Sequence, residues 1–112
     1  MLPYNDYLQI VLDIGKFIIT DDRIQERVSV RISFARSGMA PVGWLRLKTM
    51  HSEHPIQSDI EVWEGDGANI LLFASAFELE DSNKEILEFQ KFECIDIDAA
   101  KVVIEKIIEL YE

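Results

Sequence analysis

The residues best able to bind a metal ion lie in one short segment, His51-Ser52-Glu53-His54, where two imidazoles and a carboxylate fall within four positions. Zinc takes three or four such ligands, and structural zinc sites usually recruit cysteine as well. The chain has one cysteine, and no pattern marks where the remaining ligands would come from. We therefore expect a solvated loop at this segment, and a protein that holds neither a metal nor a cofactor.

The groups that could serve nucleophilic or acid–base catalysis are also isolated. Cys94 lies next to Glu93 and close to Asp96. Negative neighbours raise a thiol pKa, whereas a catalytic cysteine needs positive neighbours and a positioned histidine. Glu61 and Glu64 could form a carboxylate pair, but glycosidase chemistry needs a deep cleft that a domain of this size rarely encloses. We predict that the protein is not an enzyme.

Residues suited to binding are better represented than residues suited to catalysis. Trp44 and Trp63 fall on one parity of two predicted strands, with Arg46 and Glu61 beside them. Tryptophan and arginine are strongly enriched at the centres of protein interfaces, and an exposed patch of this kind usually marks an interaction site. The alternative is that the tryptophans stack beneath a loop while Arg46 and Glu61 form an ordinary cross-strand pair. The predicted partner-binding residues are Trp44, Arg46, Glu61, Trp63, Glu64 and Asp66.

Alternating apolar and polar residues predict the first strands of a sheet. Residues 28–34 alternate in this way, and residues 44–48 place leucines on one parity and Trp, Arg and Lys on the other. A turn is expected between them over residues 37–41, which include glycine and proline. Residues 51–58 read as a loop.

A hairpin is predicted in the second half of the chain. Gly65-Asp66-Gly67 separates the strand pattern at 60–63 from the one at 69–79. These turn residues tolerate positive φ, so the segment is a strong hairpin signal, and it lacks the further glycine and the lysine of a phosphate-binding loop. Residues 69–79 are apolar on both parities, which is typical of a central strand covered on both faces.

Residues 82–91 fit two structures. Ser82-Asn83-Lys84-Glu85 has the spacing of a capping box and could open a short helix. Alternatively, residues 85–89 begin a strand with a bulge at Gln90-Lys91. Residues 92–97 are predicted to be a strand in either case.

Two amphipathic helices complete the domain. The first is expected to run from a cap at Asn5 or Asp6 to about Thr20, and the last to begin at a cap on Asp98. The predicted fold class is α+β, a single domain over residues 1–112 with an antiparallel meander of four to six strands and both helices on one face. Strand parity turns the following residues toward the helices: Val28, Val30, Ile32, Phe34, Leu45, Leu47, Ile60 and Val62.

The net charge of −10 argues against two classes of partner. Nucleic-acid binding needs a basic footprint, and binding to anionic membrane surfaces usually does too. The charge is also uneven: residues 1–58 carry seven basic and six acidic side chains, whereas residues 59–112 carry four basic and fifteen acidic ones. Such a charge excess either keeps a protein soluble or attracts a basic partner.

The sequence favours a reducing, cytoplasmic location. Cys94 is the only cysteine, so no intramolecular disulfide can form. Residues 1–6 have neither the basic start nor the small-residue cleavage site of a secretory signal. The longest uninterrupted apolar stretch, residues 70–74, is far shorter than the ~20 residues of a membrane-spanning helix.

The helix–sheet–helix order resembles the sandwich of frataxin-type iron-binding proteins, which are similarly small and acidic. That family carries its acidic ridge on the first helix and first strand, where this chain is nearly neutral. The resemblance therefore does not imply that this chain binds iron. Size and acidity are also similar to those of type III secretion chaperones, which dimerise, although their central helix falls earlier than any candidate here. The composition of the chain is also similar to that of toxin-immunity proteins, a class that has no common motif.

These observations favour a non-enzymatic protein-binding module, most concretely an acidic immunity or inhibitor protein that neutralises a basic partner such as a nuclease toxin. The acidic second half would speed the encounter, and aromatic contacts would hold the complex. One alternative is a small ligand- or metal-handling domain of frataxin-like shape. Another is a homodimeric structural or chaperone subunit that uses the same sheet face on itself.

Overall fold

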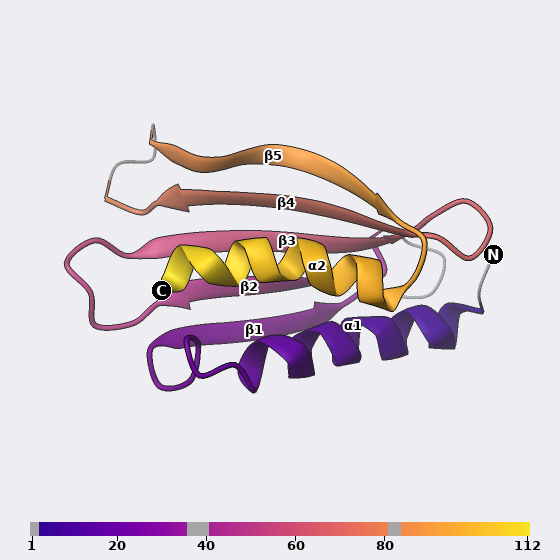
Figure 1. Ribbon diagram of the computed structural model, residues 1–112, viewed down its shortest axis with the longest axis horizontal. Helices are drawn as coiled ribbons and strands as arrows, with labels where there is room; N and C mark the ends of the chain where they lie inside the picture. The colour runs from indigo at the N-terminus through magenta and orange to yellow at the C-terminus, as the bar shows by residue number, and fades with distance from the viewer. Residues whose placement is uncertain (1–2, 36–40, 81–83) are drawn as a thin grey trace.

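The computed structural model describes residues 3–35, 41–80 and 84–112, and in these the chain runs helix, five strands, helix (Figure 1). The strands pair antiparallel with their neighbours in the chain, in the order β1-β2-β3-β4-β5. The α+β meander predicted from the sequence is therefore confirmed. The elements are α1 (Tyr4–Ile19), β1 (Val28–Phe34), β2 (Gly43–Thr49), β3 (Ile56–Glu64), β4 (Ile70–Glu78), β5 (Glu85–Cys94), α2 (Ile97–Ile108) and the short 3-10 helix η1 (Glu109–Tyr111).

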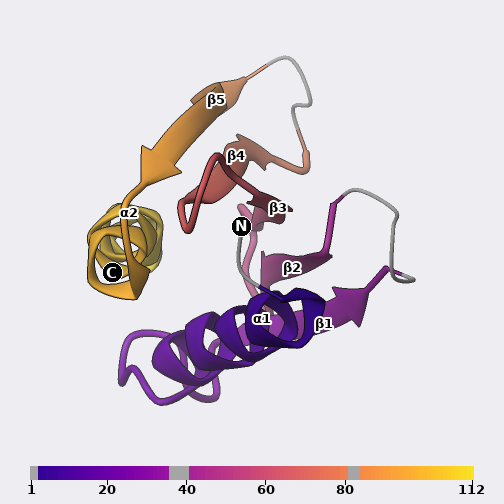
Figure 2. The same cartoon turned by 90° about the vertical axis from the view of Figure 1, so that its right-hand side faces the viewer.

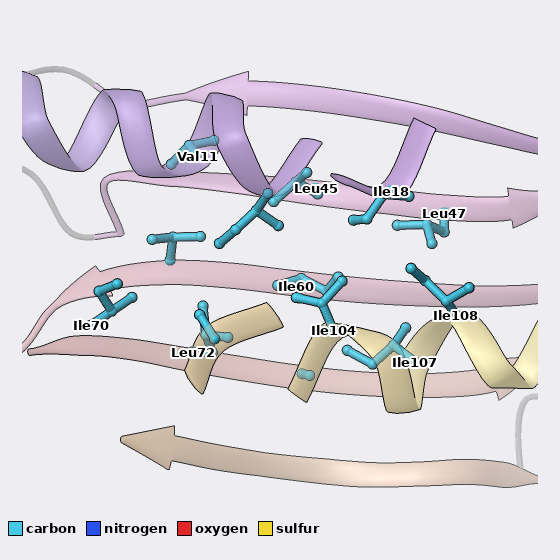
Figure 3. Packing of buried hydrophobic residues seen from close by; sticks show 14 of the residues in the cluster. Val11, Ile18, Leu45, Leu47, Ile60, Ile70, Leu72, Ile104, Ile107 and Ile108 are labelled. Atoms are coloured by element: carbon cyan, nitrogen blue, oxygen red, sulfur yellow. The ribbon is translucent and has the colours of Figure 1, made fainter. Parts of the chain in front are cut away.

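Both helices lie on the same face of the sheet, with α1 over the β1–β3 side and α2 over β4 and β5 (Figure 2). Each helix buries one stripe of side chains against alternate residues of the strands, the arrangement that helical and strand periodicity require. Figure 3 shows residues of this core: Val11, Ile18, Leu45, Leu47, Ile60, Ile70, Leu72, Ile104, Ile107 and Ile108.

Gly15 weakens the helical pattern in the sequence, yet it is buried in the middle of α1. A Cβ atom at this position would lie 2.5 Å from Cδ1 of Ile32 and 3.6 Å from Cδ2 of Leu45. The missing side chain therefore lets the helix approach β1 and β2 closely, which compensates for the helix propensity that glycine lacks.

Strand parity is predicted correctly, but burial varies along β1 because it is an edge strand. Leu45, Leu47 and Ile60 are fully buried, while Ile32 is only partly buried and Phe34 is 45% exposed. The predicted cover of β4 on both faces is wrong, since both helices pack on one face.

Several element ends differ from the sequence prediction. Helix α1 begins at Tyr4, with Pro3 at the cap position and no side-chain cap, so Asn5 and Asp6 lie inside its first turn. Strand β3 begins at Ile56, within the predicted loop, because Ile56 exchanges backbone hydrogen bonds with the Thr49 hydroxyl at 3.2 and 3.4 Å. Helix α2 is capped by Asp96, whose carboxylate accepts a hydrogen bond from the Ala99 amide at 2.8 Å.

Residues 85–91 form part of strand β5, so the alternative of a strand, and not of a helix, is correct there. The other residues of the predicted capping box, 82–83, and most of the predicted turn at 37–41 lie outside the described residues. The pairing of β5 with β4 shifts register twice, between Ala74 and Ala76 and between Ala76 and Phe77. These irregularities lie N-terminal to the bulge expected at residues 90–91.

Ser58 is a buried polar residue inside β3, and its partner comes from the other end of the chain. Its hydroxyl lies 2.7 Å from the Tyr111 hydroxyl, which also donates to the Leu47 carbonyl at 3.3 Å. Burial raises the pKa of Tyr111 to about 12. This contact fixes η1 over β2 and β3 without leaving a buried hydroxyl unsatisfied.

Arg23 joins the segment after α1 to the C-terminal end of the chain. Its guanidinium contacts the carboxylates of Asp21 at 2.8 Å, Glu105 at 2.7 Å and Glu112 at 2.9 Å. The hydrogen bond from Arg23 lowers the pKa of Asp21 to about 2 and is the largest cause of that shift.

The Asp21–Arg23 contact predicts a defined pH dependence of stability. Because the pKa of Asp21 falls from 3.8 to about 2 on folding, its contribution is complete above pH 3.8 and disappears as the pH falls through 2. The contribution is ~1 kcal/mol at most, since the pair is open to solvent. Wild type and Asp21→Asn should therefore differ in free energy of unfolding at pH 5 and converge near pH 2 in urea titrations. A difference that persists unchanged to pH 2 would contradict the assignment.

No helix within the described residues is long and apolar enough to cross a membrane.

Candidate functional site

The sheet turns a second face away from both helices (Figure 2), which we call the helix-free face. Its side chains follow from the strand register, and they include most of the aromatic and charged residues of the strands. They are Ser29, Arg31 and Ser33 of β1; Trp44, Arg46 and Lys48 of β2; Gln57, Asp59, Glu61 and Trp63 of β3; Leu71, Phe73, Ser75 and Phe77 of β4; and Glu85, Phe89, Lys91 and Glu93 of β5.

Two adjacent rows of side chains cross the centre of this face. In the first row, Trp44 pairs with Glu61, and Glu61 pairs in turn with Phe73. In the second row, Arg46 pairs with Asp59, and Asp59 with Ser75. Directly opposite side chains lie about 5 Å apart and diagonal ones about 7 Å apart, so the register places Trp44 beside Glu61 and Arg46 in the adjacent row.

Three aromatic rings form a cluster across β3, β4 and β5. The Phe73 ring lies 5.5 Å from the Trp63 ring at an interplanar angle of 60°, and 5.5 Å from the Phe89 ring at 19°. Phe73 is partly buried by these neighbours, whereas Phe89 remains 59% exposed and Trp44, farther along the row, 40% exposed. Two large aromatic surfaces therefore stay in contact with water.

A groove of about 440 Å³ lies between these exposed aromatic residues. It forms where Ser75, a small side chain, follows Phe73 on β4, so that Trp44 and Phe89 line a hollow over the middle of the sheet. A neighbouring hollow of about 300 Å³ shares Ser75 and Phe89 with the groove. Of the residues that the structure describes, those that line the groove are Pro41, Trp44, Leu45, Arg46, Asp59, Ile60, Glu61, Ser75 and Phe89.

The charged groups of the groove are held by hydrogen bonds. Arg46 Nε donates to Asp59 Oδ1 at 2.7 Å, and Gln57 Nε2 donates to Asp59 Oδ2 at 3.2 Å. Trp63 Nε1 donates to Glu61 Oε1 at 3.0 Å. Both oxygens of Asp59 are thus occupied, whereas Glu61 Oε2 has no partner among the residues that the structure describes.

The helix-free face is balanced in charge although the chain has a net charge of −10. Its strand residues include four basic and four acidic side chains, so the acidic excess lies on other parts of the surface. The basic residues are Arg31, Arg46, Lys48 and Lys91, and the acidic ones are Asp59, Glu61, Glu85 and Glu93.

The predicted partner-binding residues fall into two groups. Trp44, Arg46 and Glu61 line the groove, and Trp63 adjoins it through Glu61 and Phe73. Glu64, by contrast, pairs with Ile70 on the opposite parity, and Asp66 lies exposed in the turn between β3 and β4.

Six lining residues were not among the predicted partner-binding residues: Pro41, Leu45, Asp59, Ile60, Ser75 and Phe89. Three of these, Asp59, Ser75 and Phe89, belong to the helix-free face. Asp59 directly follows the segment expected to be a loop. Phe89 lies in the segment whose sequence is compatible with either a helix or a strand. The register shifts in β5 also change which face of the sheet its side chain occupies, so alternation alone does not predict its position.

The other candidates for chemistry lie apart from the groove. His54 Nδ1 lies 3.4 Å from Glu80 Oε2, with both side chains largely exposed. Across residues 3–35, 41–80 and 84–112, the structure shows no group of three His, Cys, Asp or Glu side chains that could hold a metal ion. Cys94 is buried, and burial, followed by the charge of Asp96, raises the pKa of its thiol.

Comparison of this sequence and fold with protein-family models, curated proteins and solved structures gives no match.

Proposed function

We propose that this protein is a non-enzymatic protein-binding module that uses its helix-free face, most concretely an acidic inhibitor or immunity protein for a basic partner such as a nuclease toxin. The observation that supports this proposal best is the groove between Trp44 and Phe89, where aromatic surface stays exposed beside fixed charged groups. Aromatic residues and arginine at the centre of a polar surface are typical of the part of an interface that carries most of the binding energy.

The size of the face suits a protein partner. Five strands of seven to ten residues, spaced about 4.8 Å apart and rising about 3.3 Å per residue, give a face on the order of 650 Å². A standard interface buries about 800 Å² on each partner, so this face with its rim would be sufficient.

The distribution of charge supports a basic partner. The face itself has equal numbers of basic and acidic residues, so a basic partner meets no net repulsion there. The net charge of −10 on the whole chain attracts such a partner from a distance. Attraction from outside the contact surface raises the association rate more than it slows dissociation.

This division of roles predicts different effects for charges outside and inside the groove. Removing two charges outside it, with Glu64→Gln and Asp66→Asn together, should slow association ~2- to 5-fold at low salt and leave dissociation unchanged. The difference should vanish near 1 M salt, where charges are screened over ~3 Å. Surface plasmon resonance measures both rates, and the charge-conserving pair Glu64→Asp with Asp66→Glu is the control. A salt-independent association rate would mean that the acidity serves solubility alone.

Charge segregation on the face favours one second candidate, a homodimer. Three of the four basic residues of the face, Arg31, Arg46 and Lys48, lie on β1 and β2, while its four acidic residues lie on β3 and β5 together with Lys91. A two-fold axis parallel to the strands would place the basic side of one copy over the acidic side of the other. Sedimentation equilibrium of wild type and Arg31→Glu separates the two candidates, since only a homodimer through this face dissociates in the variant.

The proposal is tested by capture of partners from the native host. A Trp44→Ala, Phe89→Ala double variant removes the aromatic lining of the groove, and Val102→Ala, at a 62% exposed position on α2, is the control. We expect one protein, basic in sequence, to be retained by wild type and the control but lost from the double variant. Equal retention by all three would show that the face is not the binding surface.

A further inference from the structure

The groove on the helix-free face combines exposed aromatic rings with a carboxylate, and a cation is the ligand that can interact favourably with both. Trp44 and Phe89 present exposed aromatic rings to it, and Glu61 presents a carboxylate. Aromatic faces carry partial negative charge and attract ammonium and guanidinium groups. Apolar ligands would use the rings but would leave the carboxylate desolvated.

The carboxylates of the groove are not equivalent. Asp59 is neutralised by Arg46 at 2.7 Å and also accepts from Gln57. Glu61 is oriented by Trp63 through one oxygen only, and its second oxygen has no counter-charge among the described residues. One fixed negative charge is therefore available for a ligand, on the residue paired directly with Trp44.

An anionic ligand fits this arrangement less well. Among the described residues that line the groove, one is basic, Arg46, and two are acidic, so together they carry a net charge of −1. Arg46 is already engaged with Asp59, and an anion would face the uncompensated Glu61 as well as the rings.

We propose that this groove binds a cationic side chain, arginine or lysine, of the partner protein, stacked against Trp44 and Phe89 and paired with Glu61. The inference rests on the proposed function for its biological meaning, but the binding chemistry can be tested without the partner. Among the two side chains, arginine has the planar group that both stacks on aromatic rings and pairs with a carboxylate.

The test is a titration of the isotope-labelled protein with Nα-acetyl-arginine amide, followed by NMR. The neutral control ligand is Nα-acetyl-citrulline amide, which keeps the shape and lacks the charge. We expect saturable shifts of the Trp44 indole and the Ser75 amide with a dissociation constant on the order of 10 mM, in keeping with two cation–π contacts and one partly exposed ion pair. The citrulline compound should give no saturable shift.

Three variants locate the binding energy. Glu61→Gln and Phe89→Leu should each weaken arginine binding at least ~3-fold, because the first removes the ion pair and the second removes one of the two ring contacts. Glu93→Gln removes the same charge on the same face but outside the groove, and it should bind as wild type does.

Equal binding of the citrulline compound, equal weakening by Glu61→Gln and Glu93→Gln, tighter binding of Nα-acetyl-glutamate amide, or no saturable shift would each overturn the inference. If the probe binds while the double variant still captures partners, the groove assignment stands and the proposed function fails. If capture depends on the face but the probe does not bind, the proposed function stands and the cation assignment fails.

Discussion

Replacing Leu47 with alanine should lower the free energy of unfolding by about 2–5 kcal/mol. Leu47 is fully buried beneath the helices, and its carbonyl also accepts the hydrogen bond from Tyr111, so the site has little freedom to collapse around the lost side chain. Urea denaturation followed by tryptophan fluorescence measures the change. The large effect follows directly from the assigned strand parity.

Two controls make this prediction specific. Lys48→Ala, one position along the strand and exposed on the other face, should change stability by less than about 0.5 kcal/mol. Ile32→Ala should fall in between, because Ile32 is only partly buried on an edge strand. A loss below about 1 kcal/mol for Leu47→Ala would show that the sheet presents the opposite face to the helices.

Trp44→Ala and Phe89→Ala should each weaken binding of the captured partner by about 2 kcal/mol or more, mainly through faster dissociation. Both residues are 40% or more exposed in the free protein, so truncating them should cost less than truncating a core aromatic residue. Their free energies of unfolding should therefore fall by no more than about 2 kcal/mol, with the smaller loss for Phe89. Calorimetric titration and urea denaturation of the same preparations give both numbers.

Trp63→Ala is the informative comparison. Trp63 packs against Phe73 and donates a hydrogen bond to Glu61, so its loss should reduce both stability and binding. If Trp44→Ala instead unfolds more easily while binding the partner normally, the tryptophan belongs to the structure of the sheet and not to an interface.

The fold was predictable because its signals are local. Alternation over residues 28–34 and 44–48 and the Gly65-Asp66-Gly67 turn determine which side chains share a face, and the turn sets the pairing of β3 with β4. That parity sufficed to bring Trp44 and Glu61 together.

The rest of the groove depends on features that no local pattern records. A shift of one residue in a strand moves every side chain to the other face, and β5 contains two such shifts, so the position of Phe89 could not be inferred from alternation. The hollow itself arises because Ser75 is small among large side chains on three strands. Similarly, the sequence predicts a loop at Ser58. Its burial in a strand depends on a hydrogen bond with Tyr111, which is distant in sequence.

The central claim is that the partner lies on the helix-free face, and site-specific photo-cross-linking tests it most directly. A photoreactive phenylalanine analogue replaces Phe89 on this face or, in a parallel preparation, Val102 on α2, both of which are more than half exposed. We predict that the analogue at position 89 cross-links the captured partner and the one at position 102 does not. Cross-linking from position 102 alone, or from position 89 only to a second copy of the chain, would contradict the account.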